Sequence, residues 1–232
     1  MNIATQFAEH GFAVVPDVFN SDEINKIIEC IDNADANHPA FRKTADLFAI
    51  RRFLKTIPEV ETFVLKEGLT NLLEQLFGAS YFIVKAIYFD KPVQSNWFVA
   101  WHQDLTISVD EKADIPGFGP WTVKPGQYAV QPPVTILENN FTVRIHLDDT
   151  TEQNGALKVI PGSHLKGIVP ATTIDPNAGN AVTCTVPAGS IMLMRPLLFH
   201  ASGRTTNQQR RRVIHIEFSN SQLPYPLKWA EN

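Results

Sequence analysis

Cysteine is scarce in this sequence. Cys30 and Cys184 are the only two cysteines among 232 residues, and they lie far apart without forming a CxxC pair. Their placement therefore gives no sign of a redox motif or a cysteine-based metal site. We expect both to be reduced, buried thiols.

Long apolar runs and a strong excess of one charge are also missing. The formal net charge is −4, and no apolar stretch approaches the roughly 18 residues that a membrane-spanning helix needs. The N-terminus shows neither the basic nor the apolar segment of a signal peptide. We expect a cytoplasmic protein that binds neither nucleic acid nor membranes. A small anionic ligand remains compatible with this charge, because a local basic pocket can exist in an acidic chain.

The chain is long enough for one domain with a sizeable core. Residues 1–80 are expected to be mostly helical, with one short strand at 12–15. Ser21 is the predicted N-cap of the first helix, which shows apolar residues at helical spacing. A second helical stretch is predicted over 58–77, with Gly68 as its candidate break.

From residue 81 onward, short runs rich in β-branched and aromatic residues alternate with turn residues. The predicted strands cover 81–89, 141–147, 157–160, 181–186, 191–194 and 213–218. Many short strands separated in this way indicate a sandwich or a barrel. We expect residues 1–232 to form a single domain that is mainly β with flanking helices, with the barrel at 81–220.

Residues 110–140 hold five prolines, three glycines and Trp121. Such a long loop is often a lid or a binding segment. Two interpretations stay open: a lid insertion in which Trp121 touches the substrate, or a surface insertion without a role. A basic cluster at Arg51, Arg52 and Lys55 is equally open, either contacting an anionic ligand or forming a solvated helix face.

His102 and Asp104 form an HxD pair, and residues two apart in a strand point to the same side. Such a pair alone is weak evidence. His200, which follows an apolar segment at 191–199, is the best candidate for a third ligand. Two histidines and one carboxylate are the ligand set of non-haem Fe(II) oxygenases, which leaves three metal positions open.

A second HxD pair, His146 and Asp148, competes for this role. It could join His200 in a cupin-like metal enzyme. Asp148 equally suits a capping or turn role, because Asp148 and Asp149 lead into the turn at 153–155. Spacing alone excludes neither site.

Three consecutive arginines, Arg210 to Arg212, precede the last predicted strand. Alternation divides this strand into a polar and an apolar face. The polar face carries Arg211, Val213, His215 and Glu217, and the apolar face carries Arg212, Ile214, Ile216 and Phe218. A guanidinium on the polar face can bind a carboxylate through two parallel hydrogen bonds. The alternative is a solvent-exposed basic strand end.

Four stretches, taken in order, resemble the phytanoyl-CoA dioxygenase family of Fe(II)- and 2-oxoglutarate-dependent oxygenases. They are Gly11-Phe12-Ala13-Val14-Val15-Pro16-Asp17, Trp101-His102-Gln103-Asp104, the segment from Asp148 to Pro161-Gly162-Ser163-His164, and His200-Ala201-Ser202-Gly203 with Arg211. Together they span most of the chain, and the ordered set is more specific than any one motif.

The resemblance implies a double-stranded β-helix, a jelly-roll or cupin-like barrel backed by N-terminal α-helices. It implies that His102, Asp104 and His200 bind Fe(II), and that the strand holding His146 and Asp148 binds no metal. It places His164 in a structural turn.

The resemblance also implies the residues that bind the cosubstrate. Arg211 and Ser202 match the positions that hold 2-oxoglutarate in the family. Arg144 matches a position beside the cosubstrate where members often carry tryptophan, so this chain departs from the family pattern there.

The implied activity is that of a non-haem Fe(II)- and 2-oxoglutarate-dependent dioxygenase. It would use O2 to hydroxylate an unactivated C–H bond of a small-molecule metabolite and release succinate and CO2, with ascorbate as a candidate reductant. A halogenase is disfavoured, because that chemistry needs the position of Asp104 free for halide. A non-enzymatic jelly-roll protein that binds a metal or ligand, and a cupin-like enzyme that does not use 2-oxoglutarate, remain as alternatives.

Overall fold

The computed structural model describes residues 2–44, 48–93, 95, 97–124, 127–170, 172 and 180–232. The helices are α1 (Ile3–His10), α2 (Ser21–Asp32), α3 (Phe53–Thr56), α4 (Glu61–Val64), α5 (Glu67–Phe77) and α6 (Val134–Glu138), with 3-10 turns η1 (Pro58–Val60), η2 (Glu152–Asn154) and η3 (Ser163–Lys166). The strands are β1 (Phe12–Val15), β2 (Phe41–Lys43), β3 (Phe48–Arg51), β4 (Phe82–Lys91), β5 (Val99–His102), β6 (Ile107–Val109), β7 (Trp121–Lys124), β8 (Gln127–Val130), β9 (Phe141–His146), β10 (Leu157–Val159), β11 (Val182–Cys184), β12 (Ile191–Met194), β13 (His200–Ser202) and β14 (Arg211–Ser219).

Two antiparallel sheets form the barrel. The larger has the strand order β1-β12-β9-β14-β4-β3-β2, and the smaller has the order β11-β10-β13-β5. Neighbours in each sheet come from distant parts of the chain, as when β14 pairs with both β4 and β9. The arrangement is a double-stranded β-helix, which confirms the predicted mainly β fold with flanking helices.

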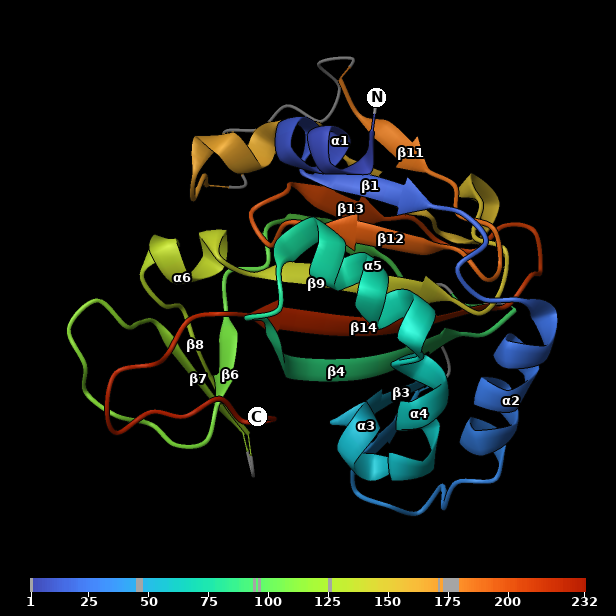
Figure 1. Cartoon of the computed structure of the whole chain (residues 1–232), viewed down its shortest axis with the longest axis horizontal. Coiled ribbons are helices and arrows are strands. Elements are labelled where there is room, and N and C mark those ends of the chain that lie inside the picture. The colour runs from blue at the N-terminus through green and yellow to red at the C-terminus, as the bar shows by residue number, and fades with distance from the viewer. Residues whose placement is uncertain are drawn as a thin grey trace.

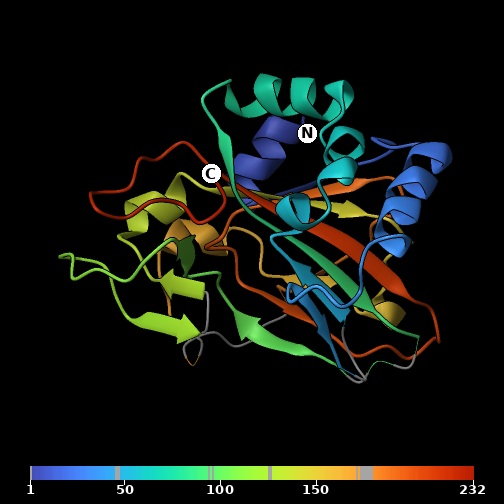
Figure 2. The same cartoon turned by 90° about the horizontal axis from the view of Figure 1, so that it is seen from below.

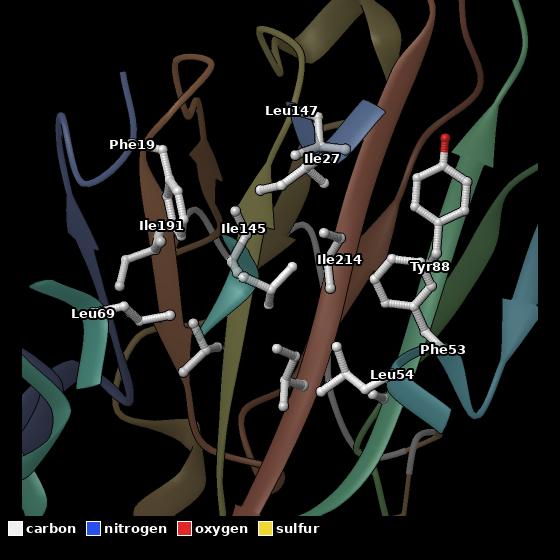
Figure 3. Packing of buried hydrophobic residues seen from close by; sticks show 14 of the residues in the cluster. Phe19, Ile27, Phe53, Leu54, Leu69, Tyr88, Ile145, Leu147, Ile191 and Ile214 are labelled. Carbon is white, nitrogen blue, oxygen red and sulfur yellow. The ribbon is translucent and has the colours of Figure 1, made fainter. Parts of the chain in front are cut away.

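The N-terminal helices cover the outward face of the large sheet (Figures 1 and 2). Side chains from these helices pack against every second residue of the central strands and form the main core. Figure 3 shows Ile145, Ile191 and Ile214 on three neighbouring strands, together with Ile27 and Leu69 from the covering helices. Each such fully buried isoleucine or leucine stabilises the fold by about 1.5 to 3 kcal/mol. A smaller apolar cluster lies between the two sheets and includes residues of β10, β11 and β12.

The boundaries of two helical stretches differ from the prediction. Asn20, rather than Ser21, is the N-cap of α2, and it exchanges hydrogen bonds with Glu23 in a capping box. The stretch 58–77 breaks at residues 65–66 instead of at Gly68, which lies inside α5. Glu23 also pairs with Lys66 at 2.6 Å, so the start of α5 is tied to α2.

The N-terminal third also contains strands that the sequence analysis did not predict. β2 and β3 extend the edge of the large sheet, so residues 1–80 are not only a helical flank. The six strands predicted beyond residue 80 all exist, with ends that differ by up to two residues. Cys184 is a buried free thiol as expected, whereas Cys30 is only partly buried.

The proline-rich segment 110–140 is more ordered than a plain loop. It supplies β7 and β8, which join β6 in a three-stranded sheet beside the barrel, and then α6 (Figure 1). Trp121 packs into an apolar cluster around Val130 and Trp229. Within the described part of the chain, no helix combines the length and apolar character that crossing a bilayer requires.

Candidate active site

Three side chains with metal-binding atoms meet at the edge of the small sheet. His102 ends β5, His200 begins β13, and the strand register places them directly opposite each other. The Nε2 atom of each histidine lies 3.7 Å from a carboxylate oxygen of Asp104. One donor atom from each of the three residues lies within 4.8 Å of the others, and no other group of three such residues was found among the described positions.

Backbone carbonyls fix the orientation of both histidine rings. His102 Nδ1 lies 2.8 Å from the carbonyl oxygen of Ala100, and His200 Nδ1 lies 2.9 Å from that of Leu198. A carbonyl oxygen can only accept, so both Nδ1 atoms carry the proton. Both Nε2 lone pairs are therefore free to bind a cation, and the rings are held as in metal sites, where the outer nitrogen donates to a fixed acceptor.

Asp104 lies just beyond the strand, whereas the sequence analysis placed it within the strand. β5 ends at His102, and the Asp104 amide donates to the carbonyl of Pro196 at 2.9 Å. The buried Gln103 between them donates to the carbonyls of Gly167 and Leu197 and accepts from the Val169 amide. Gln103 thus anchors the metal-binding turn to two distant loops, a role that only tertiary structure reveals.

The charge states of the triad suit a cation. Burial lowers the pKa of His200 to about 4, with Asp104 opposing part of this shift. Burial raises the pKa of Asp104, but His200 and three other basic groups outweigh it and hold that pKa at about 2. At neutral pH the site therefore presents a neutral His200 imidazole and a carboxylate.

The triad faces a cavity of about 230 Å³ between the two sheets. Its remaining walls come from β4, β9, β10, β13 and β14 and from the chain around residues 97–99. The lining residues besides the triad are Phe89, Trp97, Val99, Arg144, Leu157, Ser202, Arg211 and His215. All six residues proposed from the sequence for metal and cosubstrate, which are the triad together with Arg144, Ser202 and Arg211, therefore line the cavity. Trp121 is not among the described residues that line the cavity.

Arg211 occupies one part of the cavity and is 3 % exposed. Its Nη1 donates to the Gly155 carbonyl, as does the Ser202 hydroxyl at 2.9 Å, while its buried Nε has no hydrogen-bond partner. Lys91 lies opposite Arg211 in the strand register, and its Nζ donates to the Gly203 carbonyl. Burial and the neighbouring Arg144 lower the pKa of Arg211 to about 9, and burial and Arg211 lower that of Lys91 to about 8. These cations lie together although no described carboxylate forms an ion pair with either.

Gly155 makes this close approach of cations and carbonyls feasible. It adopts φ 85°, a conformation that favours glycine. A Cβ atom at this position would lie 2.6 Å from Lys91 Nζ and 2.7 Å from the Gly203 carbonyl oxygen. A side chain here would displace Lys91 from its place beside Arg211.

The two flanking arginines point away from the cavity, as the alternation predicts. Arg210 binds both carboxylate oxygens of Asp90, and Arg212 binds both of Asp148. Only Arg211 of the three therefore lines the cavity. Arg210 is an exposed side chain, as a basic strand end would be, and it also pairs with the buried carboxylate of Asp90.

A chain of buried polar groups runs along the inward face of the large sheet. Arg144 Nη1 lies 3.1 Å from His215 Nδ1, and His215 Nε2 lies 3.1 Å from Glu217 Oε1. Lys85 Nζ donates to the same Glu217 oxygen at 2.7 Å. Burial lowers the pKa of His215, which matches a neutral ring that accepts from Arg144 and donates to Glu217.

The rival HxD pair is engaged elsewhere. His146 Nδ1 lies 2.7 Å from the Thr150 hydroxyl, and burial lowers the pKa of His146 well below its usual value. Asp148 is the partner of Arg212, so the two residues do not converge on His200. His164 lies in η3 against the N-terminal segment, with Nε2 3.1 Å from the carbonyl of Ala8.

Several residues of the site escaped the sequence analysis. Lys91 and Phe89 belong to β4, and Trp97 and Leu157 come from separate segments that reach the cavity through the fold. His215 was placed on the correct face but given no role. The only sequence signal for Lys91 was a lysine at the end of an apolar strand, which also describes an ordinary surface residue.

Comparison with known proteins gives a consistent family. The family model "Phytanoyl-CoA dioxygenase (PhyH)" matches residues 7–213. An L-proline trans-4-hydroxylase from Streptomyces griseoviridis is 27 % identical over 180 residues, which cover 66 % of this chain and 59 % of the hydroxylase. The chain thus spans less than two thirds of that relative's length.

Two further matches, one in sequence and one in structure, cover nearly the whole chain. A protein from Stutzerimonas stutzeri named "Probable alpha-ketoglutarate-dependent hypophosphite dioxygenase" is 20 % identical over 98 % of this chain and 80 % of its own length. The crystal structure of the non-heme alpha ketoglutarate dependent carbocyclase SnoK from nogalamycin biosynthesis superposes with a TM-score of 0.71 at 15 % identity. That match covers 99 % of this chain and 86 % of SnoK, and it shows that the fold is shared.

Proposed function

Because this chain belongs to the phytanoyl-CoA dioxygenase family, we propose that it is a non-haem Fe(II)- and 2-oxoglutarate-dependent dioxygenase. The observation that carries the proposal is the convergence of His102, Asp104 and His200 on one wall of a cavity whose other wall holds Arg211. The first three residues offer the ligand set for Fe(II), and the fourth offers a site for a carboxylate.

The donor set fits Fe(II) on chemical grounds. Two imidazole nitrogens and one carboxylate oxygen are the typical ligands of this metal, and three ligands leave positions for other groups. The two Nε2 lone pairs are already oriented by the carbonyls that accept from Nδ1. When bound, Fe(II) would supply the redox chemistry by which O2 and 2-oxoglutarate give succinate, CO2 and an oxidised product.

We assign Arg211 and Ser202 to the distal carboxylate of 2-oxoglutarate. Arg211 is buried with an unpaired Nε, and an uncompensated buried charge is costly unless a ligand matches it. The shared acceptor at Gly155 holds the guanidinium and the Ser202 hydroxyl on one side of the cavity. Lys91 adds positive charge behind Arg211 and so favours a dianion at this end.

The remaining residues at the site exclude water from the cavity and hold the metal ligands in position. Phe89, Trp97, Val99 and Leu157 form the apolar part of the wall and exclude water from the space between the metal ligands and Arg211. Exclusion of water strengthens the ionic contacts made there. Gln103 holds the turn that carries Asp104, so the carboxylate stays aligned with both histidines.

The substrate we propose is a small-molecule metabolite that is hydroxylated at an unactivated C–H bond. A cavity of about 230 Å³ lies below the roughly 300 to 1,000 Å³ of typical ligand pockets. The named activities of two relatives, on L-proline and on hypophosphite, concern small compounds as well. These relatives make L-proline a reasonable first probe.

The test is succinate formation from 2-oxoglutarate by the purified protein with Fe(II), ascorbate and air. We expect succinate and CO2 in equal amounts, a rate that depends on added Fe(II), and loss of both products in Asp104→Ala. His146→Ala is the matched control, because it removes a buried residue of the rival pair. Succinate formation that survives Asp104→Ala but is lost in His146→Ala would overturn the proposal.

A further inference from the structure

Arg144 is a second buried guanidinium in the active-site cavity. The protein groups around it hold it in place but do not neutralise its charge. It is 7 % exposed, its Nε has no hydrogen-bond partner, and its Nη1 contacts only the neutral His215. No carboxylate of a described residue lies within ion-pair distance of it. A buried cation without an anionic partner destabilises the fold, so it is expected to be matched by a ligand.

Arg144 and Arg211 serve different parts of the cavity. In the strand register Arg144 pairs with His215, four residues along β14 from Arg211. Four residues of strand span about 13 Å, so the two arginines are anchored at separate points of the cavity wall, although their guanidiniums are close enough for Arg144 to lower the pKa of Arg211. Asp104 opposes the burial that lowers the pKa of Arg144, whereas it has no comparable influence on the pKa of Arg211. Arg144 therefore belongs to the metal end, where the reacting C–H bond of a substrate must lie.

The groups behind Arg144 hold it rigidly. His215 accepts from the guanidinium and donates to Glu217, which is in turn fixed by Lys85 at 2.7 Å. Lys85 and Glu217 neutralise each other, so they cannot also neutralise Arg144. This chain of His215, Glu217 and Lys85 therefore orients Arg144, while the positive charge of Arg144 remains available to a ligand.

A charge count points the same way and rests on the proposed function. Fe(II) and the two arginines that line the cavity contribute four positive charges, Asp104 contributes one negative charge, and 2-oxoglutarate contributes two. One positive charge of this set remains unmatched, and Lys91, which lies beside Arg211 outside the cavity lining, adds to the excess. A monoanion reduces this excess, and a guanidinium binds a carboxylate with two parallel hydrogen bonds.

We propose that Arg144 binds the carboxylate of the primary substrate, so that the enzyme acts on a small carboxylic acid. His215, Glu217 and Lys85 are positioning residues for this guanidinium. Arg144 thus determines which substrates are accepted, while Arg211 binds the cosubstrate.

The experiment has two readouts on Fe(II)-loaded enzyme. One is the Kd of 2-oxoglutarate, measured by calorimetry without O2. The other is the stimulation of succinate release by free acids, each paired with its neutral carboxamide. L-Proline and L-prolinamide are the first pair, followed by the other amino acids and short-chain monocarboxylic acids. The variants are Arg144→Met, Arg144→Lys and Glu217→Gln. Arg211→Met is the reference for loss of cosubstrate binding, and Arg42→Met is a control that removes an exposed cation of β2.

We expect at least one free acid to stimulate succinate release while its carboxamide does not. Arg144→Met should raise the KM for that acid about 30-fold or more, the factor that corresponds to losing one partner of a buried charge pair. It should leave the Kd of 2-oxoglutarate unchanged and should not lower the melting temperature. Arg144→Lys and Glu217→Gln should show smaller rises in the same KM, and Arg42→Met none.

Three results would overturn the proposal. The first is a rise in the Kd of 2-oxoglutarate in Arg144→Met as large as in Arg211→Met, which would make Arg144 a cosubstrate residue. The second is equal stimulation by acids and carboxamides. The third is a wild-type enzyme that binds and turns over 2-oxoglutarate but responds to no acid of the panel. Failure of the proposed function itself is distinguishable, because wild-type enzyme would then not bind 2-oxoglutarate.

Discussion

The outward face of β14 packs Ile214 and Ile216 against the N-terminal helices, where apolar burial stabilises the fold. The inward face of the same strand carries Arg211, His215 and Glu217, all nearly as deeply buried. Burying such groups costs free energy unless partners compensate it, and Arg211 has no carboxylate partner among the described residues. One strand thus has an outward face that stabilises the fold and an inward face whose buried charge requires a bound ligand for compensation.

The largest effect is expected from removing a metal ligand, since the polar side chains that face the cavity depend on the ligands bound there. His102→Ala and His200→Ala should each lose Fe(II) binding and reduce 2-oxoglutarate turnover more than 100-fold. This exceeds the roughly 10- to 100-fold loss typical of residues that only orient a ligand. Iron content and succinate release are the measurements. His146→Ala is the control and should keep both; retained iron in His102→Ala together with loss in His146→Ala would move the metal to the rival pair.

Arg211 tests the inward face of β14 directly. Arg211→Ala should weaken 2-oxoglutarate binding by about 2 to 5 kcal/mol, as expected for one partner of a buried ion pair. Arg211→Lys should also raise the KM for 2-oxoglutarate strongly, because a lysine cannot make two parallel hydrogen bonds. Calorimetry with 2-oxoglutarate measures the first effect, and iron content is checked in each variant.

The neighbouring arginines are the controls for that prediction. Arg210→Ala and Arg212→Ala should change the affinity for 2-oxoglutarate little, since their side chains bind Asp90 and Asp148. A large loss of affinity confined to either one would show that the inward and outward faces of β14 have been assigned the wrong way round.

The outward face should behave in the opposite manner. Ile214→Ala removes a fully buried side chain beneath the helices and should lower the free energy of unfolding by about 2 to 5 kcal/mol. The protein that remains folded should bind 2-oxoglutarate with unchanged affinity. Denaturant unfolding measures the unfolding free energy, and calorimetry measures the affinity for 2-oxoglutarate. A loss of affinity at unchanged stability would contradict the assignment of the outward face to stability and the inward face to binding.

The smallest effect concerns Lys91 and the pH dependence of stability. Its pKa in the folded protein is about 8, below the roughly 10.4 of an unfolded chain. Between these values the unfolded state binds a proton that the native state does not, so Lys91 makes the unfolding free energy rise with pH. Lys91→Met should lack this increment when unfolding is followed from pH 7.5 to about 10. Parallel pH profiles for wild type and variant would contradict the assignment.

Much of this architecture is readable in the sequence because it depends on local pattern. The β-branched runs locate the central strands, and alternation along the last strand is enough to separate Arg211 from Arg212. β2 and β3 escaped detection because they are short and contain arginine and lysine, and they are strands only through pairing at the edge of the large sheet.

The candidate site was readable only where residue type already suggested chemistry. His102, Asp104 and His200 stand out as metal donors, so their convergence could be expected. Gln103 and Lys91 are ordinary polar residues in the sequence, and their roles depend on contacts with residues more than sixty positions away. The sequence identified Arg144 as a cavity residue but did not show its role. Its contact with His215 forms only because β9 and β14 pair in the sheet.

The most direct test of the central claim is the position of the metal and cosubstrate themselves. Crystals grown with Fe(II) and 2-oxoglutarate without O2 should be measured at the iron absorption edge. The account predicts one anomalous peak bounded by the Nε2 atoms of His102 and His200 and the carboxylate of Asp104, with the distal carboxylate of 2-oxoglutarate on Arg211. A peak at His146 and Asp148, or 2-oxoglutarate bound away from Arg211, would contradict it.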